Sequence, residues 1–201
     1  KERIAIGKVG VDHAAIEAQK NHVYTLLWEL AKAVNTVDVY DHYVNTYSLS
    51  PRVQEATLVR DHMAFQQVRE TNTAAAYQGY VDRFPMAKEV YEARTRLQEA
   101  LYREATAQGD IPSFKAFIAA HPESPYVRQA EDGIYRLSTP GRTVQEYRKF
   151  IADNPENHRA PDAWRAIYEV YSRDLSVGNI TRFLQEFPDY PFVEELVEDY
   201  K

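Results

Sequence analysis

The chain of 201 residues contains no cysteine, which excludes disulfide bonds, thiolate metal ligands and a cysteine nucleophile. It has only seven glycines, a content typical of helices joined by short turns. No apolar run approaches the ~20 residues that span a bilayer, and no signal-peptide pattern occurs near the start. Because the chain opens on Lys1 rather than methionine, we expect a processed form or an excised piece.

The charge balance is acidic, with 30 acidic against 24 basic residues and a formal charge of -6. This balance disfavours binding to a phosphate backbone, and no local basic stripe is evident. We therefore expect no nucleic-acid partner. A hydrophobic content of 44% is ordinary for a folded protein, and the length allows one extended domain or two small ones.

One pattern, an amphipathic helix followed by a proline-containing junction, occurs five times. The five segments are VYDHYVNTYSLSP (39–51), AYQGYVDRFPMAK (76–88), SFKAFIAAHPESP (113–125), EYRKFIADNPENH (146–158) and ITRFLQEFPDYP (180–191). With Ser48, Pro85, Pro122, Pro155 and Pro188 as equivalent anchors, the steps are 37, 37, 33 and 33 residues. Such a period indicates stacked supersecondary units that share one core.

Equivalent positions in these units carry the same kind of side chain. Five residues before the anchor stand Tyr43, Tyr80, Phe117, Phe150 and Phe183, and eight residues before it stand Tyr40, Tyr77, Phe114, Tyr147 and Ile180. Eight residues after the anchor stand Ala56, Ala93, Ala130, Ala163 and Leu196. These spacings predict one buried face on the helix before each junction and a close helix crossing after it.

Capping residues, prolines and glycines in the sequence predict where the helices begin and end. We expect helices at 12–34, 37–47, 51–68, 73–83, 87–106, 112–120, 125–137, 143–152, 160–172, 177–186 and 191–200. Ser50 and Ser124 are predicted N-caps with a proline in the first turn, and Thr143 with Glu146 a capping box. The apolar run at residues 3–11 is ambiguous, and no segment is a convincing strand.

These observations predict an all-α fold, a solenoid of about five stacked helical hairpins. Residues 1–35 are expected to form an N-terminal segment with a capping helix, and residues 36–201 the helical hairpin repeat domain. The capping helix carries six apolar residues and is expected to cap the amino end of the stack: Ile16, Val23, Leu26, Leu27, Leu30 and Val34.

The junction His121-Pro122-Glu123-Ser124, followed by Ala130 and Tyr135, resembles that of tetratricopeptide repeats, in the divergent form found in bacterial cell-envelope proteins. The resemblance covers roughly residues 36–201 and departs from the pattern at the usual tryptophan and glycine positions. It implies a right-handed solenoid whose concave groove binds proteins, and it favours a periplasmic or cell-envelope location over the cytoplasm. Another helical-hairpin solenoid remains an alternative.

Reactive groups are weighed against structural roles. His121 shares its position with Tyr47, Phe84, Asn154 and Phe187, which indicates a helix end rather than a catalytic group. The repeated Asp-His dipeptides at 12–13, 41–42 and 61–62 are interpreted as solvated helix faces, because neighbours on a helix point ~100° apart. No metal-ligand spacing and no phosphate-binding loop occurs. We therefore expect no catalytic residues, metal or cofactor, and no enzyme activity.

The expected function is that of a non-catalytic scaffold that binds a peptide or protein segment. Homo-oligomerisation is left open. In the tetratricopeptide-like frame, the groove would present Glu92, Arg96, Tyr126, Arg136, Arg159 and Glu169. Tyrosines outside the aligned positions are further candidates for partner contact: Tyr91, Tyr102, Tyr126, Tyr171 and Tyr190. Two alternatives remain, a structural or oligomerisation domain of a larger protein and an enzyme with its site in the groove.

Overall fold

A computed structural model describes residues 3–6, 9–172 and 177–198 of the chain. The chain divides into two compact units, residues 1–100 and 101–201. Helices make up nearly all the regular structure in the described ranges, as the sequence predicts. The exception is the ambiguous apolar run near the N-terminus, which forms two short strands.

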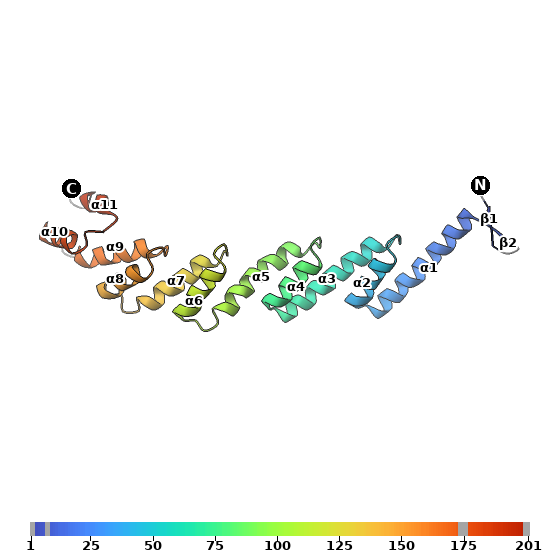
Figure 1. Ribbon diagram of the computed structural model, residues 1–201, viewed down its shortest axis with the longest axis horizontal. Helices are drawn as coiled ribbons and strands as arrows, with labels where there is room; N and C mark the ends of the chain where they lie inside the picture. The colour runs from blue at the N-terminus through green and yellow to red at the C-terminus, as the bar shows by residue number, and fades with distance from the viewer. Residues whose placement is uncertain (1–2, 7–8, 173–176, 199–201) are drawn as a thin grey trace. The chain divides into compact units, whose positions relative to one another are not determined.

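The first unit begins with an antiparallel pair of strands, in which Ile4 lies opposite Val11. Its elements are β1 (Arg3–Ile6), β2 (Val9–Asp12), α1 (His13–Val34), α2 (Val37–Thr46), α3 (Val53–Thr71), α4 (Ala74–Arg83) and the first part of α5 (Val90–Ala105). From α1 to α4, each helix packs against the next one in the sequence (Figure 1).

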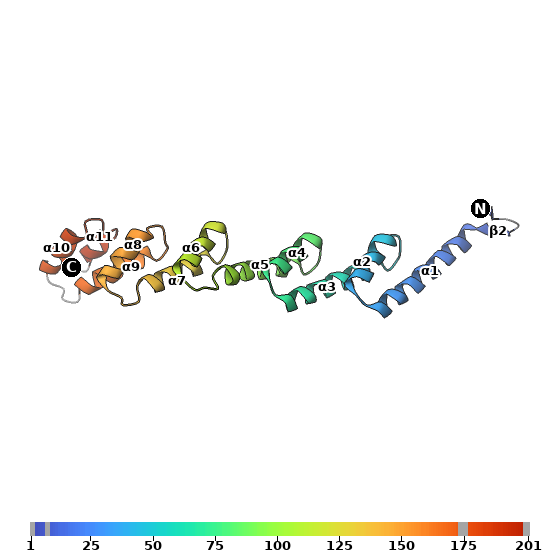
Figure 2. The same cartoon turned by 60° about the horizontal axis from the view of Figure 1, so that its bottom comes forward.

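The second unit consists of consecutive helices in its described residues. After the end of α5 come α6 (Ile111–Ala120), α7 (Val127–Ser138), α8 (Val144–Asp153), α9 (Ala160–Tyr171), α10 (Val177–Glu186) and α11 (Val193–Glu198). Within this unit α6 packs on α7, α7 on α8, α8 on α9 and α9 on α10 (Figure 2). Where both ends of a predicted helix are described, the bounds differ from prediction by at most three residues, as at Thr71 against 68 and Val90 against 87.

The predicted buried positions are confirmed. The aromatic side chains five residues before each anchor are at most 2% exposed. The alanines eight residues after the first four anchors are fully buried, and Leu196 is 2% exposed. Burying an aromatic ring of this kind stabilises the fold by roughly 1.5–3 kcal/mol, so this repeated position anchors each helix pair.

The junctions between paired helices share one backbone pattern. In the third junction the amide of His121 donates to the carbonyl of Phe117, the amide of Ser124 to that of His121, and the amide of Val127 to that of Ser124. The junctions at Tyr47, Phe84 and Asn154 repeat these three bonds. His121 is therefore the C-cap of α6, as expected for a helix end.

The predicted serine caps are wrong in detail. Helix α7 starts at Val127, and its N-cap Tyr126 makes no side-chain capping bond. Ser124 instead accepts a hydrogen bond from the Tyr126 amide, 3.4 Å away, within the turn before the helix. Ser50 makes the equivalent bond before α3. The tight turn needs two residues after the serine, so the proline lies in the turn and not in the first helical turn.

The caps of the second helix of each pair follow the prediction more closely. Thr36, Thr73, Asp110 and Thr143 each accept a hydrogen bond from the amide three residues on, and Thr143 with Glu146 forms the predicted capping box. The residue before each cap has a left-handed backbone, at Asn35, Asn72, Gly109 and Arg142.

The apolar stripe of α1 faces away from the helix that follows it. Trp28 and Ala31 are each 3% exposed and pack with Tyr40 and Tyr43 of α2. Of the six apolar residues noted in the capping helix, only Leu27 joins this cluster. Helix α1 does pack on α2, but with the face that carries Trp28.

Candidate functional site

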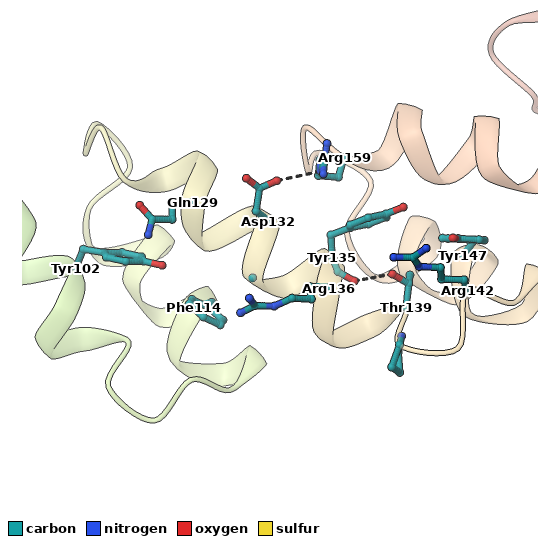
Figure 3. A pocket seen from close by; sticks show the side chains of 12 residues that line it. Tyr102, Phe114, Gln129, Asp132, Tyr135, Arg136, Thr139, Arg142, Tyr147 and Arg159 are labelled. Carbon is teal, nitrogen blue, oxygen red and sulfur yellow. Dashed lines mark hydrogen bonds and ion pairs between the residues drawn. The ribbon is translucent and has the colours of Figure 1, made fainter.

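An open pocket of about 710 Å³ lies in the second unit (Figure 3). Helix α7 forms one side of it, and residues of α5, α6, the α7–α8 turn, the first turn of α8 and the residue before α9 complete it. The lining residues are Tyr102, Phe114, Gln129, Asp132, Gly133, Tyr135, Arg136, Thr139, Pro140, Arg142, Tyr147 and Arg159. Its volume is in the range of sites that hold a ligand or a few side chains of a peptide.

Aromatic rings form the walls of this pocket. Tyr102 is stacked on Tyr126 with ring centroids 5.2 Å apart, and Tyr135 is stacked on Tyr147 at 6.3 Å. Burial raises the pKa of the Tyr135 hydroxyl, and the neighbouring Tyr147 raises it further. The hydroxyl therefore stays protonated at neutral pH and is able to donate a hydrogen bond.

Gly133 lets α6 and α7 approach closely at the pocket. A β-carbon at this position would lie 2.7 Å from two ring carbons of Phe114, closer than van der Waals contact permits. Any larger residue would therefore push the ring of Phe114 or move the helix.

Arg159 is held rigidly at the rim. Its Nε lies 3.0 Å from the carboxylate of Asp132, its Nη1 lies 2.7 Å from Asp162, and the guanidinium lies 5.2 Å from the ring centroid of Tyr135. The two carboxylates neutralise this arginine, so its contribution to the pocket is shape and hydrogen-bonding capacity more than net charge.

Arg136 and Arg142 differ from Arg159 in their partners. Neither side chain forms a hydrogen bond or an ion pair with any residue in the described ranges. The side chain of Arg136 points toward Phe114, and that of Arg142 lies beside Tyr147 (Figure 3). The lining thus carries three arginines and one aspartate, a net of two positive charges, in a chain whose formal charge is -6.

The backbone at Arg142 is unusual for its residue type. Its φ is 51°, in the left-handed region, which costs a residue with a β-carbon roughly 1–2 kcal/mol. The equivalent residues are Asn35, Asn72 and Gly109, the types that adopt this conformation most readily.

The asparagines at this position also make a bond that arginine cannot make. The hydroxyl of Tyr40 donates to Oδ1 of Asn35 at 3.0 Å, and the hydroxyl of Tyr77 donates to Oδ1 of Asn72 at 3.2 Å. The residue equivalent to these tyrosines is Tyr147, but the arginine five residues before it has no acceptor atom. Local stability therefore does not account for the choice of Arg142.

The structure brings together only some of the residues expected at a binding groove. Arg136 and Arg159 line the pocket, and Tyr126 stacks on a lining residue. Glu169 is an exposed residue of α9 outside the lining. Glu92 and Arg96 belong to the first unit, where Arg96 pairs with Glu92 at 3.8 Å and with Glu99 at 3.5 Å.

The five tyrosines singled out in the sequence differ in how accessible they are. Tyr190 is 3% exposed and belongs to the core of the second unit, so it is not available to a partner. Tyr171 packs partly against that core, and its hydroxyl donates to Glu186 at 2.7 Å. Tyr102 lines the pocket but also packs edge-on against Phe117 at 5.2 Å. Tyr91 is 81% exposed in the first unit.

Sequence reasoning missed Arg142 and the wall formed by Tyr135 and Tyr147. A signal for Arg142 was present, because the dipeptides Asn35-Thr36, Asn72-Thr73, Gly109-Asp110 and Arg142-Thr143 recur at the repeat period. Only the last of them places a long charged side chain in the left-handed position.

The interpretation of Asp61 as part of a solvated helix face is also wrong. This residue is 5% exposed, and its carboxylate lies 2.8 Å from Nη2 of Arg60. Arg60 in turn contacts Asp41 at 2.9 Å. The three Asp-His dipeptides therefore do not share one role. The aspartates of two of them, Asp41 and Asp61, belong to a structural ion-pair network in the first unit.

The described residues contain neither a metal-binding cluster nor a helix suited to a membrane. No group of three or more histidine, aspartate or glutamate residues is arranged to hold a metal ion. Across the same residues, every helix is too short or too polar to traverse a bilayer.

A scan of protein-family models and a search of curated proteins found no match to this chain. The resemblance to tetratricopeptide repeats therefore stays a prediction.

Proposed function

We propose that this protein is a non-catalytic interaction module that binds an acidic segment of a partner protein in the pocket of the second unit. The observation that carries the proposal is a pocket walled by tyrosines, in which Arg136 and Arg142 form no ion pair with a described residue and the lining has a net of two positive charges. Arginine offers a planar fork of donors that matches a carboxylate, and tyrosine supplies contact area with a polar tip.

Arg142 supports a binding role by its backbone as well. A strained residue that its repeat equivalents avoid indicates a function that outweighs the local cost in stability. In the three preceding repeats the same position carries asparagine or glycine, at Asn35, Asn72 and Gly109.

The proposed module is a right-handed solenoid of helical hairpins similar to tetratricopeptide repeats. Its support is the junction pattern that recurs at Tyr47, Phe84, His121 and Asn154, together with the consecutive packing of helices within each unit. Repeats of this kind present open surfaces suited to extended segments.

The direct test measures binding of a fluorescein-labelled polyglutamate peptide by fluorescence anisotropy at low salt. Arg136→Glu and Arg142→Glu should each weaken binding by at least about tenfold, since each replaces an attraction by a repulsion. Arg128→Glu is the matched control, because Arg128 is an exposed residue of the same helix outside the pocket. It should change the affinity by less than about twofold.

A second variant separates binding from folding. Arg142→Asn restores the residue of the equivalent positions, so it should raise the free energy of unfolding by up to about 1 kcal/mol while it weakens polyglutamate binding. Loss of binding in Arg128→Glu equal to that in Arg136→Glu would show that the peptide senses only net charge, and the pocket would lose its assignment.

A further inference from the structure

Helix α1 carries an apolar stripe that no described part of the chain covers. Leu26 is 57% exposed and Leu30 61%, and Ile16, Val23 and Val34 are each more than a third exposed. A shallow apolar depression of about 360 Å³ lies along the first half of the stripe, lined in part by Ile16 and Val23. Because Trp28 already packs on α2 from the opposite face, the stripe is free for a second contact.

The stripe has the spacing of a coiled-coil seam. Ile16, Val23 and Leu30 recur every seven residues, and Gln19, Leu26 and Ala33 recur with the same step between them. Helices with this repeat supercoil around each other and insert side chains of one into holes of the other. The 22 residues of α1 extend for roughly 33 Å, which is three such repeats.

We propose that α1 of one molecule pairs with α1 of a second copy in an antiparallel two-helix coiled coil. In this arrangement the seam is self-complementary in volume. Ile16 lies opposite Ala33 of the second copy, so a large side chain meets a small one, and Val23 lies opposite Leu26. One mixed layer pairs Gln19 with Leu30.

Polar contacts across the seam favour the same arrangement. In an antiparallel pair, residues on the same flank of the seam face each other, which sets His22 against Glu29 of the second copy. The two-fold symmetry makes this contact twice. A parallel pair would set His22 against Leu27 and Glu29 against Val34, so neither polar side chain would meet a polar partner on the second copy. The seam therefore fits a second copy of itself in one direction.

The first test is the oligomeric state of the whole chain, measured by sedimentation equilibrium up to about 100 µM, a range that covers dimers of modest affinity. The wild type should be a concentration-dependent dimer, and Leu26→Glu should weaken association at least about tenfold. Leu58→Glu is the matched control, because Leu58 of α3 is 60% exposed outside the stripe. A monomeric wild type, or a dimer that Leu26→Glu leaves intact, overturns the proposal.

The second test determines direction and uses the absence of natural cysteine. Ile16→Cys and Ala33→Cys are prepared separately and then mixed under mild oxidation. The antiparallel pair predicts a disulfide between the two variants in the mixture and almost none within either variant alone, because the two copies of residue 16 would be roughly 25 Å apart. Disulfides that form within each variant alone overturn the antiparallel arrangement.

Discussion

Arg60 offers the sharpest test of the energetics in the first unit. Its guanidinium contacts Asp41 at 2.9 Å and Asp61 at 2.8 Å and lies 5.0 Å from the ring centroid of Phe84. The arginine side chain is 13% exposed and that of Asp61 is 7% exposed. Arg60→Met keeps the apolar stem but leaves the carboxylate of Asp61 buried without its partner.

The size of the effect follows from this burial. Breaking a buried ion pair by removing one member costs about 3–5 kcal/mol, because a charge remains in a poorly solvated site. Replacing both members by apolar residues removes that charge, so Arg60→Met with Asp61→Leu should be less destabilised than Arg60→Met alone. Arg83→Met is the control, since the Arg83 side chain is 51% exposed and its pair with Asp41 should contribute less than about 1 kcal/mol.

The assay is urea unfolding, because urea does not screen charges as guanidinium chloride does. The chain has two tryptophans, and in a Trp164→Phe background the fluorescence of Trp28 reports on the first unit. Arg60→Met should lower the free energy of unfolding more than Arg83→Met does, and the double variant should be more stable than Arg60→Met. The opposite of either result would show that the buried carboxylate of Asp61 does not need Arg60 as its partner.

Three further predictions concern the second unit. Phe117→Ala removes a ring that is 1% exposed and should lower the free energy of unfolding by about 3–5 kcal/mol. His121→Ala should lower it by less than about 1.5 kcal/mol in the same urea unfolding experiments. A larger loss for His121→Ala than for Phe117→Ala would show that His121 is more than a helix end. Gly133→Ala should lower stability by about 1–3 kcal/mol because its β-carbon meets the Phe114 ring, and a higher melting temperature would contradict the close approach. A hydrogen bond from the cap residue's backbone amide lowers the pKa of Glu146, so its stabilising effect is present above the unfolded-state pKa and disappears as the pH falls through the lower folded-state pKa. The stability difference between wild type and Glu146→Gln should therefore shrink on acidification, and a constant difference would argue against the capping box.

The sequence was sufficient for the helices because local signals and burial agree there. Thr143 and Glu146 form their capping box from residues three apart, which no distant contact alters. The repeat positions occupied by Phe117 and Ala130 carry buried residues in every unit, so their recurrence in the sequence identifies the buried faces.

Sequence reasoning failed where a contact depends on which face of a helix its neighbour selects. The stripe of α1 has the right period, but the period does not say which of two apolar faces packs on α2, and Trp28 decides it. The burial of Asp61 likewise has no local signal, because its partner Arg60 is held by Asp41 and by the ring of Phe84 only in the folded chain. The pocket required both a left-handed arginine and the convergence of α6, α7 and α8.

One regularity explains why the step between repeats can change from 37 to 33 residues without loss of the core. Five aromatic pairs are separated by 15 residues, with ring centroids 5.1–5.7 Å apart: Trp28 with Tyr43, Phe65 with Tyr80, Tyr102 with Phe117, Tyr135 with Phe150, and Tyr168 with Phe183. The first residue of a pair lies 17 positions after its anchor in Phe65 and Tyr102, but 13 after it in Tyr135 and Tyr168.

The missing four residues are thus removed between the junction and the aromatic residue, inside the first helix of the pair. Four residues are about one helical turn, so the shorter helix presents nearly the same face, rotated by roughly 40°. Helix α3 has 19 residues and α7 has 12, yet Tyr135 meets Phe150 as Phe65 meets Tyr80. Since the spacing from Tyr135 to Arg142 equals that from Phe65 to Asn72, the shortening leaves the left-handed position in register with the aromatic pair, and Arg142 is thereby set beside the wall of the pocket.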